Sequence, residues 1–169
     1  MGLPPWTDKG LLPPGTHVAE LTDLYERFVL DAPDREHREL LFSALSVHLR
    51  LIQTIIPAGS VWIDGSFCTC ARRPPEDVDV VIHPRDWKAL ESVPAEAKMR
   101  LYGLLTLLDI AATRPPVNLS RLQPVGGAVD AFLCYPGQEA TWRGQWSSVR
   151  DADGNVVSGQ EKGFTEVAW

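Results

Sequence analysis

Cysteine is scarce in this chain of 169 residues, which has only Cys68, Cys70 and Cys134. The number is odd, and no two cysteines form a Cys-x-x-Cys pair. Both features argue against a disulfide framework and against a structural zinc site. We therefore expect a protein that works in a reducing cytoplasm.

Long hydrophobic runs are also missing. The best candidate, residues 101–112, is interrupted by Thr106 and Asp109, whereas a membrane-spanning helix needs roughly 18 or more consecutive apolar residues. The first residues lack the basic stretch and apolar core that are typical of a secretory signal peptide. We expect no membrane association and a cytoplasmic location.

Positive charge is in deficit as well. The chain has 16 Lys and Arg against 22 Asp and Glu, which gives a formal net charge of -6. Acidic chains make poor general nucleic-acid coats, so no DNA partner is expected. Binding of RNA through a local basic patch stays open, as does binding of a nucleotide whose charge is screened by a metal ion.

The composition that remains is that of one globular domain, with 44% hydrophobic and 22% charged residues. Residues 1–15 are rich in proline and glycine, which predicts an extended N-terminal arm. Residues 16–169 are expected to form a single domain.

Hydrophobic periodicity predicts alternating helices and strands. The expected helices cover residues 22–30, 34–56, 87–90 and 97–112, and the expected strands cover residues 61–63, 78–82 and 129–135. The tail should be β-rich, with a hairpin turn at Asp153-Gly154 and a last strand at 164–169. This order predicts an α/β (α+β) fold, in which helices pack on a mixed β-sheet and a β-rich C-terminal tail follows.

Two carboxylates fall on one face of a predicted strand. Side chains alternate along a strand, so Asp77 and Asp79 point to one side while Val78 points to the core. Adjacent carboxylates repel each other and are costly to bury without a cation. Mg²⁺ prefers such oxygen ligands, which makes the pair a candidate metal site. The alternative is a solvated turn after Pro74-Pro75.

A glycine-serine pair follows the strand predicted at 61–63. Glycine lets a phosphate approach the backbone closely, and a serine hydroxyl and neighbouring N–H groups can donate to it. Gly65 and Ser66 are therefore candidate phosphate-binding residues. Ser66 also suits the N-cap of a short helix, a role that is compatible with phosphate binding.

A third carboxylate, Asp130, lies early in the strand predicted at 129–135, among small and apolar neighbours. If this strand lies beside the one at 78–82, Asp130 joins Asp77 and Asp79 at one end of the sheet. Such a set can hold two metal ions for an in-line phosphoryl displacement. The alternative is a charged strand edge that prevents aggregation.

The pattern Gly65-Ser66, ten residues and then Asp77-Val78-Asp79 is similar to the signature of the nucleotidyltransferase superfamily. That superfamily is typified by polymerase β-like enzymes and by the minimal nucleotidyltransferases. The segments at residues 12–17, 63–67 and 161–164 also resemble an uncharacterised bacterial family of nucleotidyltransferase-like proteins.

The resemblance implies that Asp77, Asp79 and Asp130 are catalytic and bind two Mg²⁺ ions. Asp130 would help to deprotonate the attacking hydroxyl, and Gly65 and Ser66 would hold the β- and γ-phosphates of a nucleoside triphosphate. A nucleoside monophosphate would pass to a hydroxyl of a protein or RNA acceptor, and pyrophosphate would leave. A toxin–antitoxin or defence role, with a cognate partner protein, is the expected setting.

The chain departs from this signature after Ser66. Minimal nucleotidyltransferases often carry an arginine there that contacts the triphosphate, and this chain has none until Arg72 and Arg73. These two arginines are the candidates for that role, although loop arginines usually face water. The departure motivates an alternative function, a catalytically silent nucleotide-binding or partner-binding module of the same fold. A third interpretation is a structural protein whose acidic residues are incidental.

The six tryptophans are expected mainly to pack the core and the tail. A role for one of them in stacking on a nucleobase stays open.

Overall fold

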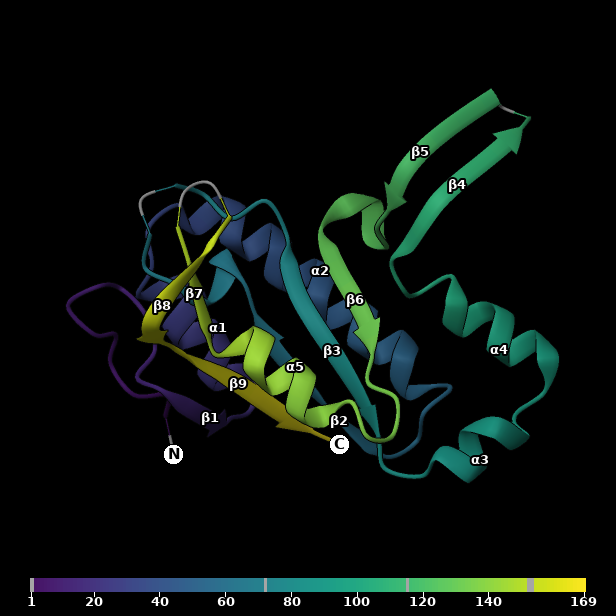
Figure 1. Ribbon diagram of the computed structural model, residues 1–169, viewed down its shortest axis with the longest axis horizontal. Helices are drawn as coiled ribbons and strands as arrows, with labels where there is room; N and C mark the ends of the chain where they lie inside the picture. The colour runs from purple at the N-terminus through teal and green to yellow at the C-terminus, as the bar shows by residue number, and fades with distance from the viewer. Residues whose placement is uncertain (1, 72, 115, 152–153) are drawn as a thin grey trace.

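The protein has an α+β fold in which a mixed β-sheet carries helices on both faces (Figure 1). The computed structural model describes residues 2–71, 73–114, 116–151 and 154–169. The helices are α1 (Leu21–Tyr25), which runs on into a π-helical turn (Glu26–Leu30), α2 (Arg35–Gln53), α3 (Trp87–Ser92), α4 (Ala95–Tyr102) and α5 (Glu139–Trp146). The strands are β1 (Gly15–Val18), β2 (Gly59–Asp64), β3 (Val78–Pro84), β4 (Leu107–Thr113), β5 (Pro116–Leu122), β6 (Val129–Leu133), β7 (Ser148–Arg150), β8 (Val156–Glu161) and β9 (Gly163–Ala168).

Five strands form the main sheet in the order β1-β9-β2-β3-β6. β2 is antiparallel to both β3 and β9, whereas β1 pairs with β9, and β3 with β6, in parallel. The predicted mixed sheet with helices packed on it is therefore confirmed. The strand that carries Asp130 lies directly beside the strand that carries Asp79.

One face of the sheet carries the main hydrophobic core. Val78, Val80 and Ile82 alternate into this core and are fully buried. The apolar side of α2, from Leu41 to Ile52, is buried in the same core, as the spacing of its leucines predicts. Burying each such side chain contributes about 1.5–3 kcal/mol relative to leaving it exposed. This packing fixes β3 and therefore turns Asp79 to the opposite face.

The opposite face is covered in part by α5, which Figure 1 shows in front of the sheet, with α2 behind it. Trp62, Val81 and Phe164 form a small cluster under α5 together with Trp146. Asp79 lies two residues before Val81 on β3. The aromatic cluster and the carboxylate therefore share one side of the sheet.

The helix predicted at residues 97–112 is wrong in its second half. α4 ends at Tyr102 with Gly103 as its C-cap residue, and the chain then forms β4, which pairs with β5 in an antiparallel hairpin. Thr106 explains the difference, because its backbone N–H donates to the Ala131 oxygen over 2.8 Å and its hydroxyl accepts from the Ala131 N–H. This attachment to β6 outweighs the helical spacing of the leucines. Figure 1 shows the β4–β5 hairpin projecting away from the main sheet.

The two ends of the chain pack on the sheet. Leu3 and Leu12, in the segment predicted as an extended arm, are buried, and β1 follows directly and pairs with β9. Neither β1 nor α5 was predicted. The predicted tail strands are present as β7, β8 and β9; of the predicted turn, Gly154 is described and Asp153 lies outside the described residues. Within the described part of the chain, no helix is long and apolar enough to cross a membrane.

Candidate functional site

Three aspartates stand side by side at one end of strands β2, β3 and β6. In the register of the strands, Asp64 of β2 is opposite Asp79 of β3, and Asp79 is opposite Asp130 of β6. Residues that are opposite each other share a face of the sheet, so these three side chains, the acid row, point to one side. The structure thus brings together Asp79 and Asp130, as the sequence predicts, and adds Asp64, which was not predicted.

Asp79 is in the centre of the acid row, and its surroundings disfavour the ionised form of its carboxyl group. Burial raises the pKa of Asp79 to about 7, and the carboxylates of Asp77 and Asp64 contribute to the rise. Lys162 and Arg121 lower the same pKa but do not cancel the effect. Desolvation is the largest cause of this rise, and a cation bound beside Asp79 would oppose it by favouring the ionised carboxylate.

Asp130 is 3% exposed and has two partners. The Thr106 hydroxyl donates to its Oδ1 over 2.6 Å, and Arg121 of β5 forms an ion pair with its Oδ2. The β4–β5 hairpin therefore brings a cation to the acid row. The Arg121 side chain is 43% exposed, so this ion pair lies at the solvent-facing edge of the site.

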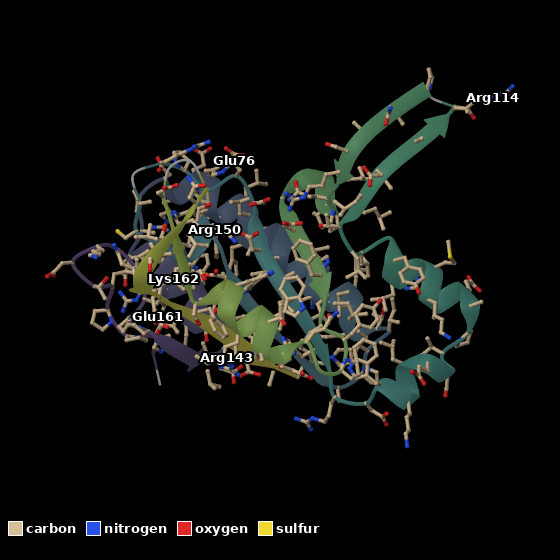
Figure 2. All side chains as sticks on the ribbon, viewed as in Figure 1. Glu76, Arg114, Arg143, Arg150, Glu161 and Lys162 are labelled. Atoms are coloured by element: carbon tan, nitrogen blue, oxygen red, sulfur yellow. The ribbon has the colours of Figure 1, made fainter. Side chains whose placement is uncertain are left out.

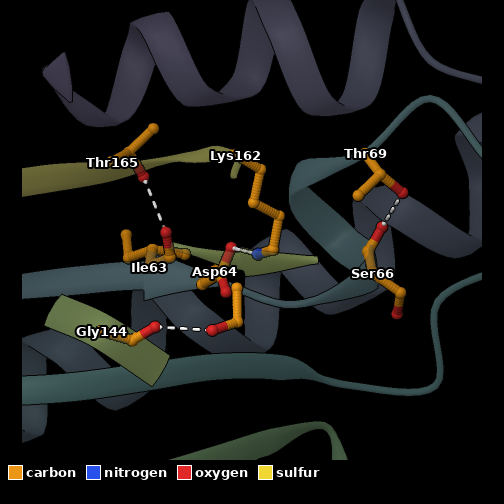
Figure 3. A network of polar contacts seen from close by, with 8 residues as sticks. Ile63, Asp64, Ser66, Thr69, Gly144, Lys162 and Thr165 are labelled. Carbon is orange, nitrogen blue, oxygen red and sulfur yellow. Dashed lines mark hydrogen bonds and ion pairs between the residues drawn. The ribbon is translucent and has the colours of Figure 1, made fainter. Parts of the chain in front are cut away.

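Asp64 forms an ion pair with Lys162, which lies between β8 and β9 (Figure 3). Both side chains are largely buried, at 9% and 12% exposure. Burial raises the pKa of Asp64, and the Lys162 ammonium opposes that rise. Side chains alternate along β2, and Ile63 points into the core. The next residue, Asp64, therefore faces the opposite side of the sheet, and this pattern is visible in the sequence. Lys162 is 98 residues away in sequence, and no local pattern connects it to Asp64.

Asp77 lies just before β3 and at the margin of the site. Its Oδ2 accepts a hydrogen bond from the Gln123 amide. Asp77 adds to the negative charge around Asp79 but is not among the residues that line the cavity beside the acid row. The two carboxylates predicted as a pair therefore differ in their surroundings.

The Gly65-Ser66 turn packs tightly against the acid row. Gly65 has φ of 83°, and a Cβ at this position would overlap the Asp79 carboxylate. Glycine is therefore required both by the backbone conformation and by the close approach. The Ser66 side chain is exposed to the cavity, and its hydroxyl has no hydrogen-bond partner among the described residues.

A buried arginine holds this turn in place. The Arg38 side chain is fully buried and donates to the carbonyl oxygens of Phe67 and Thr69 over 2.7 and 2.9 Å. The Thr69 hydroxyl in turn donates to the Ser66 carbonyl, as Figure 3 shows. These bonds leave the Ser66 hydroxyl free while fixing the backbone that carries it.

The acid row, Gly65 and Ser66 line a cavity of about 830 Å³, which lies within the range of about 300–1,000 Å³ found for small-molecule sites. Four cationic residues line the same cavity: Lys9, Arg121, Arg150 and Lys162. Figure 2 shows Arg150 and Lys162 on the same side of the molecule, far from Arg114 at the tip of the β4–β5 hairpin. The cavity therefore offers carboxylate oxygens and positive charges together.

Of the two arginines predicted to contact phosphate, the structure describes Arg73 alone. Arg72 lies outside the described residues. The Arg73 side chain is 81% exposed and pairs with Glu76, and Arg73 does not line the cavity. The cations that do line the cavity come from distant segments, which only the folded chain brings near Ser66.

The donor set suits Mg²⁺, although the site is partly neutralised by the protein itself. In the part of the chain that the structure covers, no group of three or more His, Cys, Asp or Glu side chains is placed to hold a metal ion. Arg121 forms an ion pair with Asp130 of the acid row, and Lys162 forms one with Asp64. Asp79 itself has no ion-pair partner among the described residues, and Mg²⁺ prefers such oxygen ligands.

No curated protein and no solved structure matches this chain. A protein family does match it, over residues 4–168. The acid row, the Gly65-Ser66 turn and Lys162 all lie inside the matched region. The chain therefore belongs to DUF6932, a family of unknown function.

Proposed function

We propose that this protein is a magnesium-dependent nucleotidyltransferase. The observation that carries the proposal is a single cavity that holds the acid row, the Gly65-Ser66 turn and four cationic side chains. Carboxylates suit Mg²⁺, whereas the glycine turn and the cations suit phosphates. A nucleoside triphosphate with Mg²⁺ presents both partners at once.

Asp77, Asp79 and Asp130 are the residues that would hold two Mg²⁺ ions, with Arg121 released from Asp130. Mg²⁺ supplies charge neutralisation on the phosphates and on the leaving pyrophosphate. An acceptor hydroxyl attacks the α-phosphorus, the bond to the bridging oxygen breaks and pyrophosphate leaves. A carboxylate oxygen of Asp130 receives the hydroxyl proton.

The phosphate contacts come from both the turn and the cations. The free Ser66 hydroxyl and the backbone at Gly65 contact the β- and γ-phosphates. Lys162, already at the acid row, supplies the positive charge that Arg72 and Arg73 were predicted to supply. Arg121 moves from Asp130 to a phosphate when the nucleotide enters, because a phosphate also offers it two parallel hydrogen bonds.

The acceptor is a protein or an RNA hydroxyl, and the reaction takes place in the cytoplasm. The protein's net charge of -6 favours a protein acceptor over a long RNA. A toxin–antitoxin or defence system, with a cognate partner protein, is the setting that we propose.

One observation favours a second function, a catalytically silent nucleotide-binding module. Arg121 and Lys162 neutralise two of the three carboxylates of the acid row without any metal ion. If these ion pairs persist when a nucleotide is bound, the protein binds phosphate with Lys9 and Arg150, the other two cationic residues that line the cavity, and does not transfer the nucleotide.

Transfer of a labelled nucleotide separates the two functions. The purified protein is incubated with Mg²⁺, each α-³²P-labelled nucleoside triphosphate and a bacterial lysate as a source of acceptors. The nucleotidyltransferase proposal predicts label on protein or RNA, which is lost in Asp79→Asn and kept in the control variant Asp8→Asn, whose carboxylate is exposed. Nucleotide binding without label on any acceptor supports the silent module instead.

A further inference from the structure

The cavity that contains the acid row also has an aromatic wall. Phe132, Trp142 and Trp146 line it. Phe132 lies two residues after Asp130 on β6 and on the same face of the sheet, which places it about 7 Å further along the strand. Acidic and aromatic surfaces therefore belong to one continuous space.

The aromatic wall is held in a fixed orientation. Trp142 packs on Phe132 with ring centroids 5.2 Å apart and planes inclined by 36°. Trp146 meets Trp142 edge-on at 5.1 Å and is itself only 6% exposed. Phe132 and Trp142 are only partly buried, and both line the cavity.

A polar side chain stands beside the aromatic wall. Gln145 of α5 lines the cavity and is exposed, and its amide has no hydrogen-bond partner among the residues that the structure describes. The amides of Gln123 and Gln160, in contrast, are both in hydrogen bonds. A free glutamine amide both donates and accepts, so it can contact the edge of a planar heteroaromatic ring.

We propose that Phe132 and Trp142 form a stacking subsite for the base of a nucleotide and that Gln145 contacts the edge of that base. A nucleotide joins a planar ring to a polyanion through one sugar, which fits an aromatic wall beside a cluster of cations and carboxylates. The proposal rests on the proposed function for the phosphate end of the ligand. Stacking tolerates every base, so Gln145 is the residue that discriminates between bases.

Calorimetric titration of the full chain tests the subsite without any need for turnover. The wild type, Trp142→Ala, Trp142→Phe and Gln145→Ala are titrated with the four nucleoside triphosphates, the four nucleosides and inorganic tripolyphosphate, with and without Mg²⁺. Trp87→Ala is the matched control, because Trp87 stacks on Tyr135 and does not line the cavity. Trp142→Phe keeps an aromatic ring, so comparing it with Trp142→Ala distinguishes a loss of stacking from a loss of correct folding.

Trp142→Ala is expected to weaken nucleotide binding about 5- to 150-fold, the range that alanine substitution gives for base stacking. Its affinity for tripolyphosphate should stay unchanged, and Trp142→Phe should keep most of the nucleotide affinity. Gln145→Ala should alter the order of preference among the four bases.

The other outcomes are distinct from one another. A wild type that binds tripolyphosphate as tightly as any nucleoside triphosphate overturns the stacking subsite and leaves the phosphate site standing. Nucleosides that bind in a Trp142-dependent way, while tripolyphosphate does not bind and the triphosphates bind no more tightly than the nucleosides, support the subsite and overturn the phosphate site of the proposed function. A wild type that binds none of these ligands overturns both.

Discussion

Replacing Asp79 by asparagine should stabilise the folded protein at neutral pH. Burial and the neighbouring carboxylates raise the pKa of Asp79 from 3.8 to about 7, so the folded state holds this proton more tightly than the unfolded state does. The stabilisation from the bound proton is fully present below about pH 4 and is lost as the pH rises through about 7. The pKa difference between the folded and the unfolded state corresponds to about 4 kcal/mol of stability. Asparagine removes the charge and therefore avoids this loss at neutral pH.

Urea unfolding of both proteins in the presence of a chelator, at pH values from about 4 to 8, measures the effect. The stability gap in favour of Asp79→Asn should be near zero at about pH 4 and approach about 4 kcal/mol by pH 7.5. A gap of that size raises the melting temperature by about 8–16 °C for a chain of this length. Asp8→Asn, the exposed control, should show no such gap. Equal stability of Asp79→Asn and the wild type at pH 7.5, or a gap that widens toward acidic pH, would refute this reasoning.

Three further substitutions test the packing around the site. Gly65→Ala should destabilise the fold by about 2 kcal/mol or more, because it combines a left-handed backbone with steric overlap; Gly144→Ala, in an open position of α5, should instead stabilise by about 0.5–1 kcal/mol in thermal unfolding. Lys162→Gln should cost about 3–5 kcal/mol in urea unfolding, because it leaves a buried carboxylate unpaired, and adding Asp64→Asn should restore most of that loss. Arg38→Met should cost at least about 3 kcal/mol by the same measurement, because it leaves buried backbone carbonyls without donors.

Local patterns were sufficient to predict the strand that carries Asp79. Val78 and Val80 alternate with the carboxylates, and this period of two directly determines which side chains enter the core. The glycine-serine turn was predictable for a similar reason, because a glycine after an apolar strand indicates an unusual backbone conformation or a close approach. In the structure Gly65 has both.

The remainder of the site depends on contacts between distant segments. Arg121 reaches the acid row on a hairpin that the leucine spacing of residues 97–112 predicted as helix, and the attachment of Thr106 to β6 decides against that helix. Lys162 reaches Asp64 across 98 residues. Trp142 faces the cavity because α5 crosses the sheet there, and α5 itself has no strong periodic signal. Such contacts leave no trace in a short stretch of sequence.

Nucleotidyl transfer is tested most directly by following the two ends of the triphosphate separately. The wild type and Asp79→Asn are incubated with Mg²⁺, a lysate and each nucleoside triphosphate, labelled either at the α-phosphate or at the γ-phosphate. We predict that the α-label becomes attached to a protein or RNA, that the γ-label is released as pyrophosphate, and that both products disappear in Asp79→Asn even though that variant is the more stable protein. Transfer of the γ-label to an acceptor, or nucleotide binding with no release of pyrophosphate from any of the four triphosphates, would contradict the proposed function.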